Sequence, residues 1–244
     1  MWGFVKKVGR AITGAISQTA NVVREVANRS IGIPDFVLTL FGLYLPKRML
    51  VRAVILRSES TALISNEATV QDALYYANAI FKEKMNVKIL PAGGDAVQLL
   101  DYAAPTAALE PRCGTVGTGA WADDMGVAGE YFRTYLAVHP IRSMTGYGAP
   151  ITVFIVRSIR GDYKGCSLGP LEDYVTVDLV GLGEMPDPDV STPRSRTVAH
   201  EIGHACGLPH AASGSNLMLP GGTGTDLGKW QKATFRNSRH VTFF

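Results

Sequence analysis

The chain has 244 residues, of which 46% are hydrophobic and 18% are charged, and its formal net charge is +3. This length fits one sizeable domain with an appendage, or two small domains, and the hydrophobic fraction is sufficient for a packed core. The small net charge and the lack of any nucleic-acid recognition motif exclude a general nucleic-acid-binding protein.

The first 28 residues predict an amphipathic helix, because apolar residues recur every three or four positions. These positions are Val5, Val8, Ile12, Ile16, Thr19, Val23 and Val26. Basic residues lie between them, and Trp2 and Phe4 stand at the start. Two interpretations fit: a helix packed on its own domain or on a sister chain, and a helix lying on a membrane surface.

Residues 31–45 form the most apolar run of the chain, interrupted by Pro34, Asp35 and Gly42. The run is shorter than the ~18 apolar residues that a membrane span requires. The run fits a segment of the hydrophobic core, a buried tether, or a pro-segment that crosses a cleft with Asp35 placed on a metal.

Polar residues between Ala11 and Val23 argue against an ordinary signal peptide at the start of the chain.

From residue 49 onward the pattern predicts a strand, a helix and a second strand. Residues 50–56 are dense in branched side chains, as are residues 86–90. Between them, the stretch from Thr69 to Asp72 resembles a capping box at the start of a helix. Residues 95–150 are rich in Gly and Ala and predict an insertion or long loop with one helix around residues 129–138.

The second half of the chain predicts strands over residues 151–156 and 174–180. A helix is expected to begin at Thr192, with Pro193 at its first position, and to run to Cys206. Residues 226–239 predict a closing helix with Trp230 and Phe235 facing the core.

Residues 200–210 read H-E-x-x-H-x-x-G-x-x-H. His200 and His204 are four residues apart, so on a helix they share one face and can bind one ion. Gly207 can end that helix, because glycine accepts the left-handed backbone conformation, and the chain can then bring His210 to the same ion. Three imidazoles leave the fourth zinc position open for water, as in a catalytic site.

A second signal is Met218, eight residues after His210. The motif and this methionine together resemble those of the metzincin metallopeptidases, whose three-histidine motif is followed by a Met-turn beneath the metal. The resemblance implies one catalytic Zn²⁺ ion held by His200, His204 and His210, with Glu201 as general base. It also implies that Met218 is the Met-turn residue.

The resemblance further implies an α/β (α+β) fold of the zincin type. Such a fold has a twisted mixed β-sheet, a backing helix, an active-site helix and a small C-terminal subdomain. Residues 165–170 resemble the edge strand that lines the substrate cleft, where an extended peptide can dock. The sequence departs from astacin-like and serralysin-like members, because Pro220 stands where they place a tyrosine ligand.

These observations lead to the hypothesis of a zinc endopeptidase that acts on a protein or peptide substrate. Zinc and Glu201 would activate a water molecule, and Glu201 would pass the proton to the leaving amine. Residues 1–45 would be an anchor, a packing element or a pro-segment, and residues 46–244 the catalytic domain. The alternative is a membrane- or partner-binding module, led by residues 1–45, whose metal site is structural or inactive. The resemblance favours a secreted protein.

The three cysteines, Cys113, Cys166 and Cys206, are too few for a disulfide framework. Cys206 is expected to be buried, while Cys113 and Cys166 can pair. The stretch around Cys113, Pro-Arg-Cys-Gly, also resembles the cysteine switch of matrix metalloproteinase propeptides, in which a thiolate occupies the open zinc position. That switch precedes the first strand, whereas here two predicted strands precede Cys113, so a simple loop cysteine is preferred. His139 and His240 are expected to be surface or packing residues.

Overall fold

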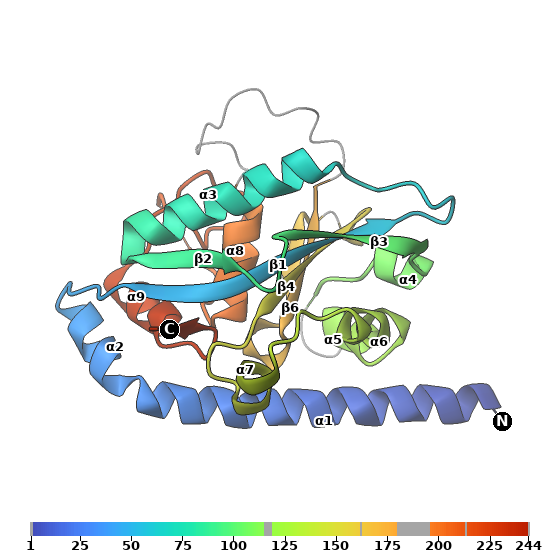
Figure 1. Ribbon diagram of the computed structural model, residues 1–244, viewed down its shortest axis with the longest axis horizontal. Coiled ribbons are helices and arrows are strands. Elements are labelled where there is room, and N and C mark those ends of the chain that lie inside the picture. Colours follow the sequence, from blue (N-terminus) through green and yellow to red (C-terminus); the bar gives the residue numbers. More distant parts are fainter. Residues whose placement is uncertain (1, 115–118, 162, 180–195, 213, 244) are drawn as a thin grey trace.

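The computed structural model describes residues 2–114, 119–161, 163–179, 196–212 and 214–243. In this part of the chain, a seven-stranded mixed sheet carries helices on both faces (Figure 1). The helices are α1 (Trp2–Ile31), α2 (Ile33–Leu40), α3 (Glu67–Met85), α4 (Thr106–Leu109), α5 (Ala120–Asp124), α6 (Val127–Thr134), α7 (Pro140–Thr145), η1 (Gly169–Leu171), α8 (Thr197–Ala205) and α9 (Lys229–Arg236). The strands are β1 (Lys47–Arg57), β2 (Val87–Pro91), β3 (Val97–Ala103), β4 (Ile151–Val156), β5 (Gly165–Ser167), β6 (Tyr174–Asp178) and β7 (Val241–Thr242).

The sheet is built around β1, its longest strand. β2 and then β3 run parallel to β1 along one edge, and β4 runs parallel to it along the other. β6 follows β4, and β5 closes that side as an antiparallel edge strand. β7 returns from the C-terminal end and pairs antiparallel with the start of β1. The predicted mixed sheet is therefore confirmed.

Both faces of β1 are buried, which explains the apolar run from Met49 to Leu56 that only Arg52 interrupts. Val51 and Ile55 belong to the core beneath α3 and α8. Val54 and Leu56 point to the opposite face, where they join a second core with residues from α4 and α6. The predicted backing and active-site helices, α3 and α8, thus cover one face together.

The start of α3 differs from the prediction of a capping box at Thr69. Asn66 is the N-cap residue, and its side-chain oxygen accepts a hydrogen bond of 2.7 Å from the Thr69 amide. Thr69 itself is buried in the first turn. The helix therefore begins with an asparagine cap that stands two residues before the first apolar residue of the helix.

Residues 95–150 were predicted as an insertion or long loop, and this prediction was wrong in part. Among the described residues of this stretch, the first element is β3, which extends the sheet along β1, and four short helices follow. Only Val97 and Leu100 of β3 are buried. Its sequence therefore lacks the regular alternation of apolar and polar residues that predicts a strand. Main-chain pairing with β1 holds the strand in place. The single helix expected over residues 129–138 is α6, which begins and ends earlier.

The closing helix α9 is shorter than predicted, and Trp230 does not face the core. Its side chain is 67% exposed and packs at a tilt against Phe36 of α2, with ring centroids 5.5 Å apart. Phe235 is fully buried, as predicted, and packs on Phe81 of α3. The packing of α2 against α9 determines which side chains of α9 face the core, and the sequence of α9 alone does not indicate this packing.

Asp35 of α2 does not lie on a metal. Its carboxylate forms ion pairs with Arg236 at 2.7 Å and with Lys47 at 2.9 Å, and all three side chains are at most 4% exposed. Burial is the largest effect on Lys47 and lowers the pKa of its amine. The interpretation of Asp35 as a cap on the zinc is therefore wrong.

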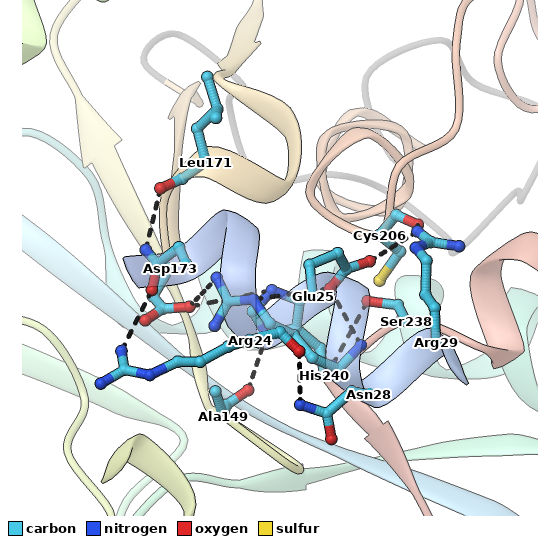
Figure 2. Close-up of polar contacts among 12 residues, drawn as sticks. Arg24, Glu25, Asn28, Arg29, Ala149, Leu171, Asp173, Cys206, Ser238 and His240 are labelled. Atoms are coloured by element: carbon cyan, nitrogen blue, oxygen red, sulfur yellow. Dashed lines mark hydrogen bonds and ion pairs between the residues drawn. The ribbon is translucent and has the colours of Figure 1, made fainter. Parts of the chain in front are cut away.

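The last turns of α1 are bound to the rest of the molecule by a buried polar network (Figure 2). Glu25 pairs with Arg29 at 2.6 Å and accepts a hydrogen bond from the Arg239 amide. Arg29 donates to the carbonyl oxygen of Cys206 at 3.0 Å, directly after α8. His240 is fully buried, in agreement with a packing role, and its Nδ1 lies 2.8 Å from the Ala149 carbonyl.

Cys113 and Cys166 form a disulfide, which joins the segment after α4 to the edge strand β5. The sulfur of Cys113 is therefore engaged by another cysteine and does not act as a switch on the histidines. Cys206 is free and buried, as expected. Among the described residues, no helix combines the length and apolar character needed to cross a bilayer.

Candidate metal centre

Helix α8 carries the first part of the histidine motif and ends at Ala205. Gly207 adopts a φ of +87°, the left-handed conformation expected of the residue that ends this helix. Thr192 and Pro193, which were expected to begin the helix, lie outside the described residues; the described helix starts at Thr197.

The three motif histidines converge on one point. One nitrogen from each of His200, His204 and His210 lies within 4.8 Å of the others. The Nε2 atoms of His200 and His204 are 3.1 Å apart, close to the ~3.3 Å expected for two ligands about 2.0–2.1 Å from one tetrahedral zinc. The ring of His210 lies 4.6 Å from that of His204 and 5.4 Å from that of His200, measured between centroids.

Hydrogen bonds to main-chain carbonyls orient two of these rings. Nδ1 of His200 lies 2.8 Å from the Leu217 oxygen, and Nδ1 of His204 lies 2.7 Å from the Leu208 oxygen. A carbonyl can only accept, so each Nδ1 carries the proton and each Nε2 presents a lone pair. Burial lowers the pKa of His200 to about 4 and also lowers that of His204, which keeps both rings neutral at neutral pH. These properties fit a zinc ion.

Met218 lies in the turn beneath α8. Its side chain is fully buried, and its sulfur lies against Gly203 on the helix. Its carbonyl accepts a hydrogen bond of 2.9 Å from the amide of Ala211, the residue after His210. The turn thus fixes the main chain next to His210, while the neighbouring Leu217 carbonyl holds the ring of His200.

Glu201 is the buried acidic residue of the site. Burial is the largest effect on its carboxyl group and raises its pKa to about 8. The carboxyl group lies against the main chain of Gly165 in edge strand β5, and any side-chain carbon at Gly165 would overlap it. A carboxylate with a raised pKa is a better proton acceptor, and here it sits at the strand where a peptide could dock.

Arg196 supports the site, although its role was missed in the sequence. The residue is 3% exposed, and its guanidinium donates to the carbonyl oxygens of Gly224 at 3.0 Å, Asn216 at 3.5 Å and Leu219. Arg196 therefore clamps the segment on both sides of Met218. Its acceptors are main-chain groups, which every residue possesses, so no sequence signal distinguishes them.

No protein-family model matches the chain, and a search of curated protein sequences found no match. Among solved structures, the chain is similar to metalloproteinase-II from Bacteroides fragilis, with 13% sequence identity and a TM-score of 0.44. The similarity covers 76% of this chain and 50% of the other chain, so this chain matches half the length of that protein. Such a likeness concerns the fold alone, and the chemistry of the site rests on its own residues.

Proposed function

We propose that the protein is a zinc-dependent endopeptidase. One observation carries the proposal: three histidine nitrogens converge, two of them in rings oriented by main-chain carbonyls, beside a buried carboxyl group that is not one of the three ligands. In this assignment His200, His204 and His210 hold the ion and Met218 supports it from below. A structural zinc site takes four protein ligands, and the group of candidate ligands in the described residues has three.

The edge strand β5 provides a docking place for the substrate. In the described sheet it pairs with β6 on one side only, so its other edge can accept an extended peptide as an added strand. Because Gly165 of β5 touches the carboxyl group of Glu201, a peptide bound along β5 passes close to that group. A zinc ion at the histidines would supply a Lewis acid that polarises the scissile carbonyl. Glu201 would accept a proton from the attacking water and deliver it to the leaving amine.

Metal content and cleavage of an unstructured protein such as casein, measured together, test the proposal. We expect one zinc per chain, loss of cleavage on chelation and recovery when zinc is restored. His204→Ala should weaken zinc binding, because one of three ligands is removed. His139→Ala, which lies outside the cluster, is the matched control. Full zinc occupancy in the wild type without any cleavage would instead favour a binding module with a structural or inactive metal.

Gly165→Ala should separate the position of Glu201 from metal binding. The added methyl group would overlap the carboxyl group and displace it. A misplacement of about 1 Å can cost roughly 10²-fold in rate, and we expect a loss of that order with zinc content unchanged. Lys164→Ala, at the exposed preceding position, should cleave at the wild-type rate. An unimpaired Gly165→Ala variant would show that Glu201 need not occupy its observed place.

A further inference from the structure

Helix α1 is attached to the domain by its polar face. Its buried positions recur at spacings of four and three residues and are Gly14, Gln18, Asn21, Glu25 and Asn28. Gln18 donates to Asp124 at 2.8 Å, and Asn21 donates to the Leu171 carbonyl at 2.9 Å. The inner contact of this helix is therefore made by hydrogen bonds and ion pairs, with a glycine where the helix crosses Met125.

The apolar stripe of α1 faces the opposite way, into solvent. Val5, Ile12, Ile16, Val23 and Val26 are each between 54% and 65% exposed. Every exposed residue from position 8 to position 27 is uncharged. An ordinary surface helix buries its apolar stripe and exposes its polar side, and α1 does the reverse.

This outer face is long and lies at the border of the molecule. A helix of 30 residues is about 45 Å long, and Figure 1 shows α1 running along the whole length of the domain on its outer side. Ile31, the last residue of α1, is also exposed, as are Ile33 and Phe41 beyond the helix, with Phe41 80% exposed. A long band of largely apolar exposed residues on a folded protein marks an interaction site.

We propose that the outer face of α1 binds the surface of a membrane that contains anionic phospholipids. The charges of the helix support this partner. Glu25 is the only acidic residue of α1, and it is buried and paired. Lys6 and Lys7 are exposed on the first turns, beside Phe4, which is 73% exposed. The helix would lie flat, with its apolar stripe among the acyl chains and Lys6, on the flank of the stripe, near the phosphates.

The same face fits a second copy of the chain less well. In a paired helix, charged residues flank the apolar seam and set the partner and its register. Here the exposed positions beside the stripe, such as Gly9, Ala15 and Val22, are uncharged, which leaves a broad band without a charged rim. A bilayer covers the whole of such a band and does not need charged residues along its edges.

Flotation of the full-length chain with lipid vesicles tests the proposal. The wild type should float with vesicles of phosphatidylcholine containing about one-third phosphatidylserine, and less with phosphatidylcholine alone. Ile16→Glu and Val23→Glu should each weaken binding at least ~10-fold, because a charge replaces an aliphatic side chain that the membrane would bury. Lys6→Glu should weaken binding to the anionic vesicles about fivefold. Both apolar positions are exposed, so the thermal midpoints should equal that of the wild type.

The matched control is Tyr75→Glu on α3, on the far side of the domain (Figure 1). Tyr75 is 66% exposed, as Ile16 is 65% exposed, so the same charge is added at a comparable helical surface position. This variant should bind vesicles like the wild type. Failure of the wild type to float, or equal binding by Ile16→Glu, would overturn the proposal. A dimer of the wild type that Ile16→Glu dissociates would assign the face to a second copy instead.

Discussion

Replacement of Glu201 by glutamine is expected to lower peptide cleavage by about 10²- to 10⁴-fold while bound zinc stays at one ion per chain. Glutamine has nearly the same shape, so it fits against Gly165 as the carboxyl group does. It cannot accept and return a proton at neutral pH, and this is the step assigned to Glu201. The three histidines are unchanged, so the affinity for the metal should persist.

The measurement is zinc content beside the initial cleavage rate for the wild type and Glu201→Gln. Glu67→Gln, an exposed position at the start of α3, is the control for the same chemical change and should leave both quantities unaltered. Equal rates in the wild type and Glu201→Gln at equal zinc content would contradict the peptidase mechanism. A loss of zinc together with activity would mean that the carboxyl group binds the ion.

Asp35→Ala is expected to destabilise the fold by about 3–5 kcal/mol. The substitution leaves the Arg236 guanidinium, which is fully buried, and the Lys47 amine, which is 4% exposed, without the carboxylate that pairs with both. Domains commonly have about 5–15 kcal/mol of stability in total, so the loss removes a large share of it.

The measurement is the midpoint of denaturant unfolding, with the same dependence of the unfolding free energy on denaturant concentration used for both proteins. Val37→Ala on the same helix is the control, since Val37 is 43% exposed and its truncation should change the unfolding midpoint little. The prediction fails if Asp35→Ala unfolds at the wild-type midpoint. In that case α2 is a loosely attached appendage, as a removable pro-segment would be.

The central strands could be predicted because they are buried on both faces. β1, β4 and β6 are rich in branched and apolar residues that have few alternatives to a covered sheet. β3 could not be predicted, because only two of its side chains are buried and its position depends on main-chain pairing with β1.

The same distinction applies to the site. The spacing of the motif histidines places His200 and His204 on one helical face, and the structure brings His210 to them. The atoms that orient the rings are the carbonyls of Leu208 and Leu217, and the clamp from Arg196 also acts on carbonyls. Sequence patterns describe side chains, so these supports are invisible in them. The period of α1 predicts an amphipathic helix in the same way, but it does not reveal that the polar side faces inward.

The ion pairs between the two ends of the chain have a consequence for biosynthesis. Asp35 and Glu25 emerge from the ribosome early, whereas Arg236, Arg239 and β7 emerge some two hundred residues later. Until then Glu25, Asp35 and the start of β1 lack these partners, so the nascent chain carries incompletely paired charges and an open strand edge. Contacts so far apart in sequence fold slowly, and intermediates of this kind are prone to aggregate. Protection of the unfinished chain, by a chaperone or by early association of α1 with a surface, would therefore raise the yield of folded protein.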